Sequence, residues 1–161
     1  MAADMFLMLD GIKGESADDK HKGEIDIESF SWGLAQTGSG HRGTGSGTGK
    51  VDIQDIHITK KVDKSSPTIQ LACANGKHIA KGKLTLRKAG ENPLEYLTID
   101  LEGVFVSNYQ IGHSVGSTDM PSETFALNFV KVKTEYWTQS DKGAKGENAN
   151  FSWDVAKNVK Y

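Results

Sequence analysis

The sequence predicts a mainly β domain, a β-barrel of two sheets with one flanking α-helix and a long glycine-rich loop that connects two strands. Apolar and polar residues alternate from one end of the chain to the other, with the two-residue period of half-buried strands. In three segments the alternation changes phase, which indicates β-bulges, and bulged strands bend strongly enough to curl a sheet into a barrel. There is no strand–helix–strand rhythm, so a parallel α/β fold is excluded.

The three phase changes define where the strands should bend. In the segment 24–34, the apolar parity changes near Glu28 and Ser29, so a bulge or bend there would keep both apolar sets on the core. The same slip occurs within residues 53–56. It occurs again at Gly103, where a missing side chain suits a bulge.

Further strands follow from the same alternation and bring the total to about seven or eight. They are expected at residues 83–88, 123–137 and 151–161. One helix is predicted over SSPTIQLACANGK, where Ser66 can cap the exposed amides and Pro67 fits the first helical position. Asn75 and Gly76 can end this helix with a left-handed residue. Its narrow apolar or small stripe would lie against the barrel and comprises Ile69, Ala72, Cys73 and Gly76.

Composition bounds the class of protein. A chain of 161 residues forms one domain that needs no metal or disulfide to fold, and the single cysteine, Cys73, has no intrachain partner. Cys73 is therefore expected to be a small buried hydrophobic residue of a protein made in a reducing compartment. The net charge of −2 provides no basic excess for phosphates, so nucleic acid is not an expected partner. The N-terminal segment has neither a signal peptide pattern nor a membrane span.

No motif in the chain indicates catalysis, a metal or another cofactor. Gly38, Gly40 and Gly43 spell G-x-G-x-x-G, but more glycines and then a strand-like segment follow them, where a phosphate loop requires a helix. The five histidines are scattered without metal-ligand spacing, and no G-x-S-x-G elbow is present. The chain is therefore interpreted as a structural or binding protein, and not as an enzyme.

The three tryptophans keep an alternative open. They could form a sugar-stacking platform, as in a monomeric β-sandwich that binds carbohydrate. Trp32 and Trp153 lie in phase with other apolar residues, which favours the core, whereas Trp137 is expected to be partly exposed. A monomer with exposed aromatic residues would support this alternative. A third possibility, a small β-barrel enzyme, would need converging titratable groups that the sequence does not display.

Several segments together resemble one family. MFLMLDGIKGES, VDIQDIHITKKVDKSSPTIQLACANGKH, LTLRKAGENPLEYLTIDLEGVFVSNY and ETFALNFVKVKTEY are similar, in order and spacing, to the haemolysin-coregulated proteins (Hcp). These are the tube subunits of the bacterial type VI secretion system. The resemblance runs from about Asp4 to Tyr136, and its most specific parts are the SSP segment, the GKH after it and the stretch RKAGENPLEYL.

The resemblance implies an assembly and a route. It implies a homo-hexameric ring with an open centre, rings stacked into a tube inside a contractile sheath, and a spike protein at the tip. Small secreted effectors would ride in the lumen. The protein would be cytoplasmic at first and then leave through the type VI system without a cleaved signal peptide and without membrane insertion. Residues 1–161 would form a single tube domain with no C-terminal toxin extension.

Two sets of residues are candidates for function. By the resemblance to the family's extended loop, the segment 38–49 is the expected contact between stacked rings. Its candidate residues are Gly38, Gly40, His41, Arg42, Gly43, Gly45, Gly47 and Gly49. Ser31 lies between Phe30 and Trp32, so if those two side chains point to the core, Ser31 points away and could face the lumen and its effectors.

Overall fold

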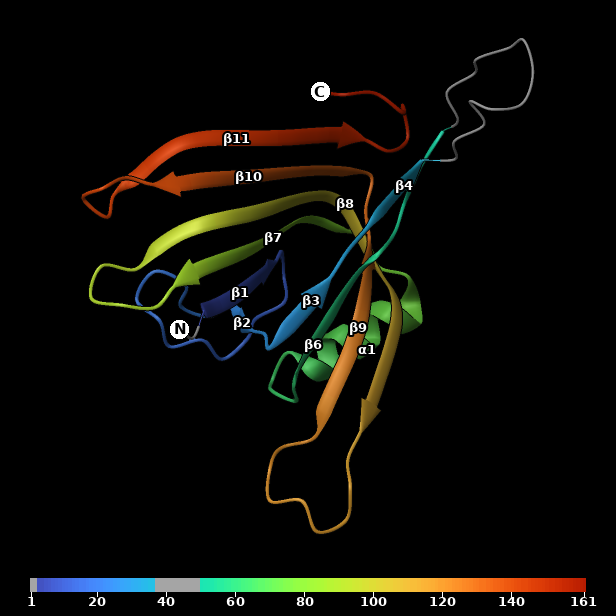
Figure 1. Ribbon diagram of the computed structural model, residues 1–161. Coiled ribbons are helices and arrows are strands. Elements are labelled where there is room, and N and C mark those ends of the chain that lie inside the picture. The colour runs from blue at the N-terminus through green and yellow to red at the C-terminus, as the bar shows by residue number, and fades with distance from the viewer. Residues whose placement is uncertain (1–2, 37–49) are drawn as a thin grey trace.

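A computed structural model describes residues 3–36 and 50–161 (Figure 1). The described residues form one helix and eleven strands. In chain order the elements are β1 (Ala3–Leu9), β2 (Ile25–Asp26), β3 (Ser29–Ser31), β4 (Leu34–Gln36), β5 (Val51–Ile53), β6 (Ile56–Lys61), α1 (Ser66–Asn75), β7 (Ile79–Lys88), β8 (Leu94–Gly112), β9 (Ser122–Asn128), β10 (Lys131–Gln139) and β11 (Lys145–Asp154). The mainly β prediction is confirmed, and so is the single helix within these residues.

Two antiparallel sheets share the long strand β8. The first part of β8 lies between β7 and β10 in a first sheet with the order β2-β1-β7-β8-β10-β11. The last part pairs with β9 in a second sheet with the order β8-β9-β6-β3. Strands β4 and β5 form a separate two-stranded sheet that leads to and from residues 37–49, and we call it the arm base. The expected loop at residues 38–49 lies outside the described residues.

The predicted barrel is not closed, which corrects the expectation from the sequence. The hydrogen-bonded path runs from β2 to β3 and is open, and these two strands are its ends. Only two residues separate them in the chain. The N–H of Ile27 donates to Met5 O at 3.2 Å in the first sheet, and that of Glu28 donates to Thr59 O at 2.9 Å in the second. The phase change therefore interrupts the ladder because the chain passes from one sheet to the other there.

The other two phase changes also coincide with breaks in the strands. Gln54 and Asp55 separate β5 from β6. Gly103 has a φ of +62°, and it lies where β8 passes from the first sheet to the second. A Cβ atom on Gly103 would lie 2.9 Å from Cγ2 of Val130, so this position requires glycine for both conformation and space. The predicted bends are confirmed at all three places.

The helix packs on the strands with the predicted stripe. Ile69 and Ala72 are buried, whereas Cys73 is only half-buried. Gly76 ends the helix with a φ of +64°, as predicted. The predicted cap is wrong, because the residue at the N-cap is Ser65 and it makes no side-chain capping bond. Figure 1 shows α1 beside β6, β8 and β9.

Three predicted strands differ in their boundaries. The expected strand at 83–88 begins earlier, at Ile79. The expected strand at 123–137 is divided at Phe129 and Val130 into β9 and β10, because the chain changes from the second sheet to the first there. The expected strand at 151–161 instead begins at Lys145 and ends at Asp154. A turn follows, closed by a hydrogen bond from the N–H of Asp154 to Val159 O at 2.8 Å.

Candidate functional site

The outer face of the second sheet is small and polar. Ser31 in β3 pairs with His57 in β6, which pairs with Ala126 in β9 and, through it, with Asn108 in β8. We call two adjacent rows of this face the polar face, and besides Ala126 they hold the polar side chains Ser29, Ser31, His57, Thr59, Asn108, Gln110 and Thr124. These two rows hold no Lys, Arg, Asp or Glu residue, so they can donate and accept hydrogen bonds without carrying those charges. The next row of the same face holds Ser122 and Lys61, and Nζ of Lys61 lies 2.9 Å from Oδ2 of Asp119.

Ser31 lies on this polar face and is exposed, whereas its neighbours Phe30 and Trp32 pack against the core. The indole N–H of Trp32 donates to Gln54 O at 2.9 Å, and its ring meets Phe129 edge to face at a centroid distance of 6.2 Å. Trp32 is thus half-buried, and both contacts hold its ring against the fold. A lumenal role for Ser31 stays a prediction, as does a stacking role for residues 38–49.

A buried charged cluster lies between α1 and the second sheet. Lys60 and Glu123 are fully buried, lie directly opposite each other in β6 and β9, and form an ion pair. Lys60 Nζ also donates to Oδ1 of Asp63 at 2.8 Å, and Ser66 Oγ donates to Oε1 of Glu123 at 2.8 Å. The phenol of Tyr109 donates to the second carboxylate oxygen of Glu123.

The pKa shifts in this cluster follow from its contacts. Burial would raise the pKa of Asp63, but hydrogen bonds from Lys60 and Ser65 outweigh it and hold that pKa below its ordinary value. Burial, together with the bond to Glu123, raises the pKa of the Tyr109 phenol. Because Lys60 and Glu123 have no solvent access, the cluster is suited to anchoring α1 and is closed to a substrate.

A second charged cluster ties the N-terminal segment to the first sheet. Arg87 donates to both carboxylate oxygens of Asp18, at 3.0 and 2.6 Å, and to Asp4 at 3.1 Å. Its guanidinium carbon lies 4.9 Å from the ring centroid of Phe6, whose other contact is His21, stacked at 4.3 Å. The hydrogen bonds from Arg87 lower the pKa of Asp18 to about 2.

Neither cluster has the composition of a metal site. In residues 3–36 and 50–161, no group of three or more His, Cys, Asp or Glu side chains could hold a metal ion. No helix among the described residues is long and apolar enough to cross a membrane.

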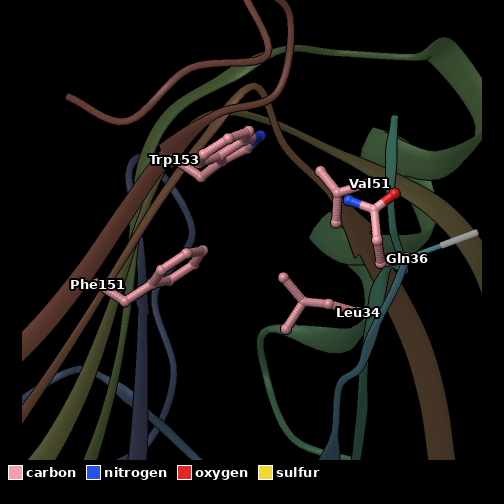
Figure 2. Close-up of a pocket in the computed structure, with 5 residues that line it drawn as sticks. All are labelled: Leu34, Gln36, Val51, Phe151 and Trp153. Carbon is pink, nitrogen blue, oxygen red and sulfur yellow. The ribbon is translucent and has the colours of Figure 1, made fainter. Parts of the chain in front are cut away.

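An apolar pocket lies between the arm base and the edge strand β11. Leu34 and Gln36 from β4 and Val51 from β5 form one wall, and Phe151 and Trp153 from β11 form the other. The pocket has a volume of about 220 Å³ (Figure 2). Trp137, the tryptophan expected to be partly exposed, lies elsewhere on β10 and is half-buried, as predicted, with Nζ of Lys145 4.1 Å from its ring centroid.

Sequence reasoning missed the Lys60–Glu123 pair and the apolar pocket. A signal for the pair was present, because Lys60 shares the parity of Ile56 and Ile58, and Glu123 shares that of Phe125. Two opposite charges at inward positions of neighbouring strands indicate a buried ion pair. No such signal exists for the pocket, since it joins strands that are distant in the sequence and not paired.

These features define a class of protein. The ion clusters serve the fold, one sheet face is mostly polar and uncharged, and apolar surface remains uncovered at an edge. This combination is typical of a structural component that assembles with other chains.

Comparison with known proteins gives the family. Residues 6–136 match the family described as "Type VI secretion system effector, Hcp". Protein hcp1 of Pseudomonas aeruginosa is 46% identical over 161 residues, which cover 99% of each chain. The chain belongs to the Hcp family, and it is a tube subunit of the type VI secretion system.

Solved structures agree with this assignment. The structure of a type six secretion system protein has a TM-score of 0.92 at 28% identity and covers 99% of this chain and 100% of its own. The crystal structure of Hcp1 from Salmonella typhimurium has a TM-score of 0.83 at 34% identity, with 100% of both chains covered. The similarity therefore extends over the whole fold.

Proposed function

We propose that six copies of this chain close into a ring, that rings stack into a tube, and that small effectors are carried in the lumen. A contractile sheath would surround the tube and a spike protein would cap its tip. The protein would be made in the cytoplasm and leave the cell through the type VI system. It would act as a structural component and would catalyse no reaction. The observation that carries this proposal is the 46% identity to an Hcp protein over 99% of both chains.

The mass of the assembly tests the proposal directly. Native mass spectrometry of the purified chain at about micromolar concentration should give a hexamer, because specific ring interfaces are stable in that range. A monomer under those conditions would contradict the proposal. It would support the alternative of a monomeric β-sandwich that binds carbohydrate.

We also propose that the polar face, with Ser31 at its edge strand, lines the lumen. A wall that faces water when the tube is empty must be solvated, and the uncharged hydroxyl, amide and imidazole groups of this face meet that need. Such a wall would bind effectors by hydrogen bonds and contact area.

Substitution of Ser31 tests this assignment. Ser31→Arg should leave the ring mass unchanged and reduce the co-purification of small effectors, because a long charged side chain would project from the polar face. Thr68→Arg is the matched control, since Thr68 is an exposed hydroxyl residue on α1. Equal effector yields from Ser31→Arg and the parent would remove Ser31 from the lumen.

A further inference from the structure

The core-facing side of the first sheet continues beyond the core onto β10 and β11. Directly paired residues share a face, and three rows of such residues cross β8, β10 and β11. The rows are Leu101, Val132 and Trp153; Ile99, Thr134 and Phe151; and Leu97, Tyr136 and Ala149. Leu101, Ile99 and Val132 are buried, whereas the side chains of Tyr136 and Phe151 are 45% and 38% exposed. The apolar face is thus covered at β8 and uncovered at β11.

The uncovered part forms one wall of the apolar pocket. Figure 2 shows the Phe151 ring and the Leu34 side chain facing each other across it. Leu34 is itself 46% exposed. Both walls therefore offer apolar surface to a space that one apolar side chain or two could fill.

The chain's own segment 38–49 does not supply such side chains. It contains six glycines, with serine, threonine, histidine and arginine at the other positions. A second set of exposed apolar residues does exist, at the connection between β8 and β9, which we call the β8–β9 end. It comprises Ile111, Val115 and Met120, of which Val115 is fully exposed.

The two apolar sets lie on opposite flanks of the molecule. In Figure 1, β11 lies at the top and the β8–β9 end at the bottom. Two unlike patches on opposite flanks are what a head-to-tail contact requires, and such contacts close into rings when the rotation between copies fits. In such a contact each patch meets the other patch of the neighbouring copy, and not the same one.

We propose that the apolar pocket receives the β8–β9 end of a second copy of this chain, and that this contact closes the ring. The inference rests on the ring proposed above and adds the surfaces that form it. Side chains such as Val115 and Met120 would enter between Leu34 and Phe151 and bury the uncovered face of the β10–β11 hairpin. Every copy uses one patch on each flank, so neither of these two patches is left uncovered in a closed ring.

Two double variants test the contact. Leu34→Glu with Phe151→Glu places charge in the pocket, and Val115→Glu with Met120→Glu places charge on the β8–β9 end. Because burying an unpaired carboxylate is strongly unfavourable, each variant alone should shift from the ring mass to the monomer mass in native mass spectrometry. All four positions are exposed, so circular dichroism should show an unchanged fold.

Mixing the two variants gives the sharper readout. Each variant keeps the surface that the other has lost, so an equimolar mixture should form 1:1 dimers and stop there. Rings that persist in either variant would overturn the contact while leaving the ring proposal intact. A monomeric parent would overturn both, and a mixture that stays monomeric would overturn the pairing of these two surfaces.

The control is Leu71→Glu on α1, an exposed apolar residue that belongs to neither patch. It should assemble as the parent does. If it also lost the ring, added charge alone would explain the result, and the assignment would be overturned.

Discussion

At the scale of single residues, the buried pair of Lys60 and Glu123 has the largest expected effect on stability. Both charges have left water completely, and their attraction and hydrogen bonds offset that loss only while both are present. The pair joins β6 to β9, and through Ser66 it also fixes the start of α1. Removing one partner should therefore be far more damaging than removing both.

Lys60→Met tests this expectation. It leaves the Glu123 carboxylate buried without a cation and should lower the free energy of unfolding by about 3–5 kcal/mol. Urea denaturation at a fixed chain concentration is the measurement, since assembly adds to apparent stability. The double variant Lys60→Met with Glu123→Leu should recover most of the loss. A double variant as unstable as the single one would contradict the uncompensated-charge explanation.

The contact between Arg87 and Asp18 predicts an acid-sensitive contribution to stability. The pKa of Asp18 is lowered from 3.8 to about 2 in the folded chain, so the folded state favours the ionised carboxylate. This contribution is fully present above pH 3.8 and is lost as the pH falls through about 2. The urea midpoint should accordingly fall over that interval. Asp18→Asn should flatten this part of the profile, and an unchanged slope would contradict the assignment.

At the scale of elements, the bend of β8 allows one strand to serve two sheets. Gly103 makes the bend with a positive φ and with Val130 packed where a side chain would stand. Gly103→Ala combines a left-handed backbone strain with a steric contact, so it should lower the unfolding free energy by about 1–3 kcal/mol. The shift in the thermal unfolding midpoint relative to the parent measures this loss of stability. Gly112→Ala is the matched control, because a Cβ there meets nothing within 4 Å, and it should be close to neutral.

Local alternation predicted most elements because a strand with one buried face records that face in its sequence. The breaks at Glu28, at Gln54 and at Gly103 could be predicted for the same reason, because the alternation changes phase at each of them. The alternation could not predict that the barrel is open, since contacts between distant segments determine which strands pair. The apolar alternation around Trp153 favours the core, yet Phe151, which shares its face, is 38% exposed. Alternation reports which face is apolar, and it does not report which chain covers that face.

Ser31 shows the corresponding limit for the candidate site. Its parity predicted that it points away from the core, and the exposed position on β3 agrees with that geometry. Whether this face lines a lumen depends on how neighbouring copies are placed. The apolar–polar alternation of one chain does not predict that placement. The apolar pocket is subject to the same limit, because its walls come from β4, β5 and β11.

At the scale of the whole molecule, ring closure and ring stacking should differ in strength. The proposed ring contact joins a pocket between strands to the connection between β8 and β9, whereas the proposed stacking contact uses a segment with six glycines in twelve residues. Ordering such a segment costs about 1–2 kcal/mol per residue in backbone entropy, so stacking should have the smaller net free energy. Rings should therefore persist at dilutions at which stacks have dissociated.

Replacing residues 38–49 with Asn-Gly separates the two contacts. Gln36 pairs directly with Val51 at the end of the arm base, so a short turn can close the hairpin without disturbing β4 or β5. This variant should give the parent's ring mass in native mass spectrometry, but no tubes by negative-stain imaging and less secretion. The variant His41→Ser with Arg42→Ser keeps the segment's length, and it shows whether these two side chains or the backbone carry the contact. If the shortened chain lost its rings, residues 38–49 would take part in ring closure. The assignment of stacking to this segment, and of ring closure to the apolar pocket and the β8–β9 end, would then be wrong.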